Sequence, residues 1–79
     1  MLRREVIRAM AKLADEWATL TRIGVAQGYP ITAQIAAKEC AHQRHQILRY
    51  LALPSPDRTF EEHVLSIVDR SMKGLKLTV

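Results

Sequence analysis

The stretch from residue 31 to residue 53, ITAQIAAKECAHQRHQILRYLAL, most constrains the fold, because no glycine or proline interrupts it between Pro30 and Pro54. Both of the residues that most strongly disfavour a helix interior are missing, so the sequence predicts one helix of about six turns. At about 100° of rotation per residue, one side of this helix collects small and aliphatic residues, and we expect that side to face the core. Its members are Ala33, Ala36, Ala37, Cys40, Ile47, Leu48 and Leu51.

The opposite side of the same helix carries a row of cations and imidazoles, and successive members are 4, 3 and 4 residues apart. Ile31 and Ile35 lie on this side as well, where an isolated monomer would expose them. We expect either a third helix or another subunit to cover the two isoleucines. The members of the row are Lys38, His42, His45 and Arg49.

Residues 2 to 22 predict a first amphipathic helix, because apolar residues recur there every three or four positions. We interpret Trp17, the single tryptophan, as an anchor of the core. The predicted core stripe consists of Leu2, Val6, Met10, Leu13, Trp17 and Leu20.

The polar side of the first helix is rich in cations. Arg4, Arg8 and Lys12 recur every four residues. Such a row is either a solvated face or a ridge that contacts an anion or an acidic partner. Both interpretations stay open from the sequence alone.

The segment from residue 23 to residue 30 separates the two long helices. Gly24 suits a left-handed C-cap, and Pro30 suits the first turn of the second helix. A connection this short predicts an antiparallel helical hairpin. Arg44 falls within the apolar side of the second helix, so it needs a carboxylate, and we expect Glu5 or an acidic group of a partner to supply it.

A third, shorter helix is predicted after the linker Leu53-Pro54-Ser55-Pro56-Asp57-Arg58. Thr59 and Glu62 have the spacing of a capping box, and the helix is expected to run to about Lys73. Gly74 suits the C′ position of a Schellman motif, with Leu75 as its hydrophobic contact. The predicted apolar stripe consists of Phe60, Val64, Leu65, Ile67, Val68 and Met72.

The tail from residue 75 to residue 79 alternates apolar and polar residues. This pattern is typical of a strand. The tail is expected either to lie over the bundle as a short extension or to pair as a strand with a partner or with its own copy.

Together these patterns predict an all-α fold in which residues 1–79 form a single domain, a three-helix bundle with a short extended tail. A chain of 79 residues with only 5% aromatic residues has a small core, so we expect a homodimer. One cysteine excludes an internal disulfide and fits a reducing compartment. No apolar run approaches the length of a membrane span, and the charged start is unlike a signal peptide, so a soluble cytoplasmic protein is expected.

Catalytic and metal chemistry find little support in the sequence. Cys40 and His42 are two residues apart, so on a helix they point in different directions and form no thiolate–imidazole pair. Glu39 and His42 match the Glu-x-x-His pair of di-iron bundles, but such a site needs two of these motifs and two further carboxylates. We therefore expect no enzyme activity, no cofactor and no bound metal, and we interpret Cys40 as a small core residue.

Two functions remain open. The first is a non-enzymatic protein-binding module, a regulator, adaptor or inhibitor that acts through helix faces. The second is a basic DNA-binding regulatory protein, which the net charge of +4 permits without requiring. If an acidic partner binds the row on the second helix, its affinity should rise as the pH falls from about 7.5 to 6, the range in which histidine gains a proton.

Overall fold

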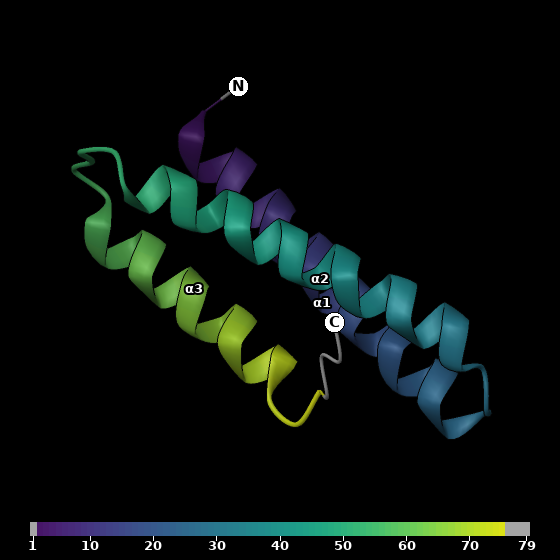
Figure 1. Ribbon diagram of the computed structural model, residues 1–79. Coiled ribbons are helices and arrows are strands. Elements are labelled where there is room, and N and C mark those ends of the chain that lie inside the picture. Colours follow the sequence, from purple (N-terminus) through teal and green to yellow (C-terminus); the bar gives the residue numbers. More distant parts are fainter. Residues whose placement is uncertain (1, 76–79) are drawn as a thin grey trace.

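Two long antiparallel helices, α1 (Arg3–Ala26) and α2 (Pro30–Leu51), form a hairpin, and the shorter α3 (Arg58–Met72) packs along one side of it (Figure 1). The structure is a computed structural model that describes residues 2–75. The predicted all-α fold, with its helical hairpin and third helix, is confirmed. The strand predicted for the tail falls mainly on residues 76–79, which lie outside the described residues.

The turn between α1 and α2 depends on Gly28 and not on Gly24. Gly28 has a φ of 76°, and the amide groups of Gly28 and Tyr29 donate to the carbonyl oxygens of Val25 and Gly24. This pattern is a Schellman motif, which ends α1 four residues later than predicted. The predicted C-cap at Gly24 is therefore wrong. Gly24 lies inside α1, where a Cβ atom would approach the backbone nitrogen of Ala33 to 3.1 Å, so its lack of a side chain lets α2 pack closely.

The core of α1 is formed by residues one position away from the predicted stripe. Ile7, Ala14 and Ala18 are fully buried, whereas Leu13 and Leu20 are 43% and 45% exposed. The other predicted members are also incompletely buried: Leu2 is exposed, and Val6, Met10 and Trp17 are half-buried. Small residues occupy the central positions because α1 lies close to its neighbours. Trp17 packs at the edge of the core.

The apolar sides predicted for α2 and α3 are largely confirmed. On α2, Leu48 is half-buried and all other predicted members are buried. On α3, Val64 and Val68 are buried, but Ile67 is 41% exposed. The remaining predicted members, Phe60, Leu65 and Met72, pack against the core.

Both ends of α3 differ in detail from the prediction. The helix begins at Arg58, its N-cap residue Asp57 makes no side-chain capping bond, and Thr59 is exposed, so the predicted capping box does not form. At the other end Gly74 has the predicted left-handed conformation, with φ of 82°. The amide of Leu75 donates to the Met72 carbonyl, which closes a type II turn in place of a Schellman motif. Leu75 makes the predicted hydrophobic contact with the core.

Candidate functional site

The outer side of α2 presents a continuous row of exposed residues that we call the outer stripe. Successive members are 4, 3, 4, 3 and 4 residues apart, so they follow one side of the helix. The first two are apolar and the other four are cationic or imidazole. The stripe consists of Ile31, Ile35, Lys38, His42, His45 and Arg49, all of which are exposed.

The apolar end of the outer stripe lies next to the turn of the hairpin. Ile31 is 72% exposed and Ile35 is 55% exposed, so α3 does not cover them, and of the two expected covers only another subunit remains. A groove of about 320 Å³ runs beside Ile31, and it is lined by small and apolar side chains of both helices. They include Val25, Pro30, Ala33 and Ala37.

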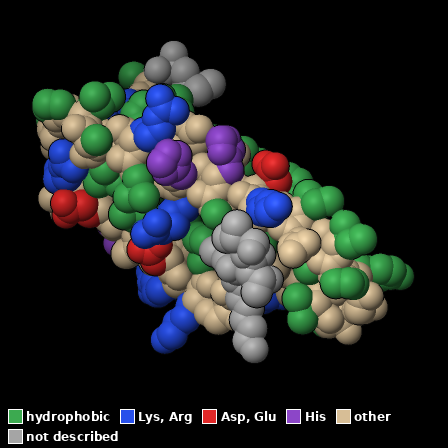
Figure 2. Space-filling model, viewed as in Figure 1, with side chains coloured by type: hydrophobic (Ala, Val, Ile, Leu, Met, Phe, Trp, Pro, Cys, Tyr) green, Lys and Arg blue, Asp and Glu red, His purple; other side chains and the backbone are tan. Residues whose placement is uncertain are grey.

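The cationic end of the outer stripe keeps its charges available. Within residues 2–75, neither Lys38 nor Arg49 forms an ion pair, and His42 makes a single contact of 3.4 Å with the Gln46 side chain. Figure 2 shows two histidine side chains beside Lys and Arg side chains on the face of α2 that is turned to the viewer. This part of α2 therefore offers positive charge and hydrogen-bond donors to an external group.

The cations of α1 that were candidates for contact with a partner are not part of the outer stripe of α2. Arg4 pairs with Asp57 at 3.1 Å, and the guanidinium groups of Arg4 and Arg8 lie 4.3 and 5.1 Å from the centroid of the Phe60 ring. Both arginines therefore help to hold α3 against α1 through cation–π contacts. Lys12 is exposed and lies apart from the outer stripe of α2.

Arg44 finds a carboxylate, but not the expected one. Its Nε atom donates to Oδ1 of Asp69 on α3 at 2.6 Å. The expected pair with Glu5 does not form, because Arg44 points toward α3 and not toward the start of α1. The pair joins the middle of α2 to the second half of α3.

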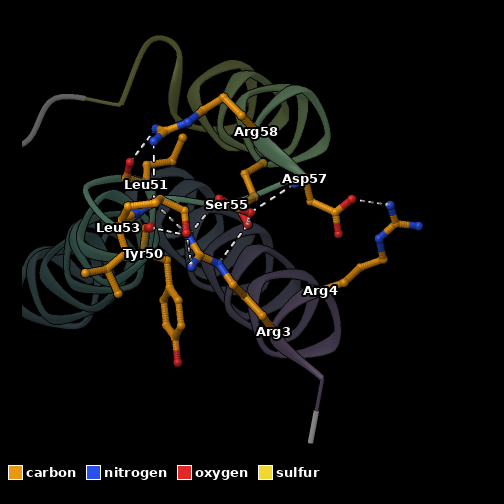
Figure 3. A network of polar contacts seen from close by, with 10 residues as sticks. Arg3, Arg4, Tyr50, Leu51, Leu53, Ser55, Asp57 and Arg58 are labelled. Atoms are coloured by element: carbon orange, nitrogen blue, oxygen red, sulfur yellow. Dashed lines mark hydrogen bonds and ion pairs between the residues drawn. The ribbon is translucent and has the colours of Figure 1, made fainter.

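A buried ion pair that sequence reasoning missed joins the start of α1 to the start of α3 (Figure 3). Glu61 is only 1% exposed, and both of its carboxylate oxygens accept hydrogen bonds from Arg3, at 2.8 and 3.0 Å. Ser55 donates a further bond of 2.8 Å to the same carboxylate. A bidentate guanidinium with an added hydroxyl satisfies a charge that burial would otherwise make costly.

The same arginine also reaches the end of α2. Arg3 donates to the carbonyl oxygens of Tyr50, Leu53 and Pro54, and its guanidinium lies 5.5 Å from the Tyr50 ring centroid. We call this network, centred on Arg3, Ser55 and Glu61, the clasp. It links all three helices at one end of the molecule, and its role is structural. The sequence signal for it was an arginine at the first turn of α1, and neither interpretation of the cationic side of that helix, a solvated face or a ridge for a partner, included an internal ion pair.

Cys40 is a fully buried core residue, as predicted. Its thiol donates to the Ala14 carbonyl oxygen at 3.2 Å. Burial raises the pKa of the Cys40 thiol from its ordinary value of 9.0; nearby Arg22 lowers it and Asp15 raises it further. A protonated and inaccessible thiol is a poor nucleophile, so this residue does not form a reactive centre.

Among residues 2–75, no three His, Cys, Asp or Glu side chains come together as ligands for a metal ion, and Glu39 and His42 stand without further ligands. None of the three helices has both the length and the apolar character needed to cross a membrane. Comparison with protein-family models, curated proteins and solved structures found no match.

Proposed function

We propose that this chain is a small non-enzymatic protein-binding module, a regulator, adaptor or inhibitor that acts as a homodimer. The observation that carries the proposal is the outer stripe of α2, which is exposed along its whole length and changes from apolar to cationic. Contiguous exposed apolar residues on a folded protein often mark a surface that meets another molecule, and the exposed Ile31 and Ile35 are one turn apart on α2, with a groove beside Ile31.

The chemistry of the outer stripe indicates what kind of partner would bind. An apolar side chain of the partner would enter the groove beside Ile31, where Pro30 and Ala33 form its walls. Carboxylate groups of the same partner would face Lys38 and Arg49, which lack internal ion pairs in residues 2–75. The best fit is a protein segment that is apolar at one end and acidic at the other.

Site-specific photo-crosslinking tests this proposal. A photoreactive phenylalanine analogue at position 31, expressed in cells of the native host, should crosslink to a distinct partner protein. The same analogue at position 67 is the matched control, because Ile67 is an exposed isoleucine on α3, outside the stripe. Lys38→Glu should weaken the crosslink from position 31 by at least several-fold. Equal products from both positions, or none from either, would count against the proposal.

The alternative is a DNA-binding regulatory protein, and the free cationic half of the outer stripe is the observation that favours it. Lys38 and Arg49 would contact phosphates, and the exposed His42 and His45 would lie between them. Binding of this kind weakens steeply with added salt. A gel shift with duplex DNA at low salt decides between the two functions, because an unretarded duplex would exclude the alternative.

A further inference from the structure

One side of the hairpin faces away from α3. The residues of α1 that contact α3 show which side this is. Besides Arg3 of the clasp, the residues of α1 with polar or cation–π contacts to α3 include Arg4 and Arg8 at Phe60, Asp15 at the Ser71 hydroxyl, and Arg22 at the Ser71 carbonyl. An apolar residue stands two positions before each of these four residues. Two positions along an α-helix are about 200° apart around its axis, so these residues point away from α3. They are Leu2, Val6, Leu13 and Leu20.

Helix α2 contributes apolar residues to the same side. Arg44 marks the direction of α3, because it pairs with Asp69. Ile35 is nine positions before Arg44, which places it about 180° away from Arg44 around the helix, and Leu53 follows two residues after the last residue of α2, Leu51. The exposed fractions of Ile35 and Leu53 are 55% and 53%. Ile35 thus lies at the border between the outer stripe and this side of the hairpin.

These residues form one surface because the two helices are in register. Gly24 lies against Ala33, and Arg3 reaches the carbonyl oxygens of Tyr50 and Leu53. This pairing puts Leu20 at the level of Ile35, and Leu2 at the level of Leu53. We call the resulting surface, which runs the length of the hairpin, the back face. Its members are Leu2, Val6, Met10, Leu13, Trp17, Leu20, Ile35, Tyr50 and Leu53.

The spacing on α1 is that of a helix that packs along its length. Val6, Met10, Leu13, Trp17 and Leu20 are 4, 3, 4 and 3 residues apart. A repeat of this kind forms a seam between nearly parallel or antiparallel helices. The contact with α2 uses only part of the seam, since Leu13 and Leu20 remain 43% and 45% exposed. The rest of the seam is the position that a further helix fills in a four-helix bundle.

The charge of the back face indicates which molecule fills that position. Its polar residues between the two apolar rows are Glu39, Gln43 and Gln46, and Glu39 is the one charged residue among them. Two cations lie at one end of this face: Arg3 contacts the Tyr50 ring, and Arg49 lines a hollow together with Tyr50 and Leu53. Between the two apolar rows the described residues include no cation, so a nucleic acid or an acidic membrane surface would find little positive charge along most of the face. Two copies of this chain, in contrast, can meet there with mainly apolar and uncharged side chains opposite each other.

The exposed apolar area approaches what a stable dimer buries. Leu2, Leu13, Leu20, Ile35 and Leu53 together expose an area on the order of 500 Å², and the half-buried members add to it, which approaches the roughly 800 Å² per partner of a standard interface. We propose that the back face binds the back face of a second copy around a two-fold axis, so that two hairpins form a four-helix layer with an α3 on each outer side. This inference rests on the proposed function in its homodimer part. Ile35, at the border of the two surfaces, is covered in such a dimer, whereas Ile31 and Lys38 of each outer stripe stay available to partners.

Sedimentation equilibrium of the whole chain tests the inference. The wild-type protein should have twice the monomer mass at tens of micromolar. Leu13→Glu places a charge at the middle of the back face and should raise the dimer dissociation constant at least tenfold. Ile67→Glu is the matched control, because Ile67 is equally exposed, at 41%, and lies on α3. This control should dimerise like the wild type, and circular dichroism should show all three proteins equally helical.

Three results would overturn the inference. A wild-type chain that stays monomeric at hundreds of micromolar excludes it without any variant. Equal dimerisation of Leu13→Glu and the wild type would place the dimer contact elsewhere. A crosslink from position 13 to a different protein, in place of a second copy, would show that another partner covers the back face. None of these results removes a partner crosslink from position 31, so the proposed function can stand or fail separately.

Discussion

The two ends of the hairpin are held together by opposite means. At the open end, where α1 and α3 begin and α2 ends, the clasp buries a charged pair and links three helices through Arg3 and Glu61. At the turn end, Gly24 and Ala33 bring two helices into close contact without polar side chains. There the apolar residues that remain, such as Ile31 and Val25, are 72% and 69% exposed.

This difference predicts that the open end stabilises the fold and that the turn end binds a partner. The charged residues of the clasp at the open end are engaged within the molecule, so their substitution should affect folding. Large apolar residues at the turn end contribute little to the core, so their substitution should affect binding alone. At the open end a charged pair is buried, and at the turn end large apolar residues are exposed, which is the reverse of the usual distribution. The composition of each end is therefore a poor guide to its role.

The largest effect is expected at the clasp. Arg3→Met leaves the Glu61 carboxylate buried with only Ser55 as a hydrogen-bond donor. Removing one partner of a buried pair costs about 3–5 kcal/mol, and the low end applies because the Arg3 side chain is 28% exposed. Urea denaturation should thus show a loss of about 3 kcal/mol in the free energy of unfolding.

The neighbouring pair of Arg4 and Asp57 is the matched control for the clasp. Its side chains are 46% and 44% exposed, so Arg4→Met should cost no more than about 1 kcal/mol. The double variant Arg3→Met/Glu61→Leu should be more stable than Arg3→Met, because it removes the orphaned charge. If Arg3→Met and Arg4→Met cost the same, the open end would not depend on a buried pair.

A smaller effect is expected at the turn end from Gly24→Ala. At an exposed helix position this change would stabilise the protein by up to about 1 kcal/mol. Here the new Cβ atom would lie 3.1 Å from the Ala33 backbone nitrogen, and crowding of this kind costs about 1–3 kcal/mol. We expect a net loss of about 1 kcal/mol in chemical denaturation and a larger loss for Gly24→Val. A gain in stability would show that the two helices do not approach so closely.

The smallest effect is expected for Ile31→Ala. Because Ile31 is 72% exposed, the free energy of unfolding should change by less than about 0.5 kcal/mol. Ile47→Ala makes the same chemical change at a fully buried position of the same helix and should cost about 2–5 kcal/mol. Thermal melts of both variants at equal concentration make the comparison. A large loss for Ile31→Ala would mean that the turn end also stabilises the fold.

The sequence predicted the helix order and most of the α2 side of the core, because a long uninterrupted helix has one unambiguous apolar face. It misplaced the core of α1 by one position. Leu13 and Trp17 form the more hydrophobic stripe, yet Ala14 and Ala18 are buried, because close packing of helices favours small residues at the contact. Periodicity alone cannot tell an apolar stripe that packs within one chain from one left for a second copy.

The candidate site was predicted in part. The outer stripe follows from the spacing in α2, and its cationic and imidazole members are exposed as expected, but the role of the arginines on α1 did not follow from the sequence. Arg3, Arg4 and Arg8 look like a solvated row in the sequence, because their partners Glu61, Asp57 and Phe60 are more than 50 residues away. A contact over that separation depends on how α3 returns to the hairpin, which no local pattern encodes.

The contacts at the ends of the helices explain part of the net charge of +4. The C-terminal end of a helix carries the negative pole of the helix dipole on its unpaired carbonyl groups. Arg3 and Arg58 donate to these groups at the end of α2, and Arg22 does so at the end of α3. Three cations thus act as helix caps, and each of them is supplied by another helix. Part of the basic character of this chain is a property of its architecture and says nothing about an anionic ligand.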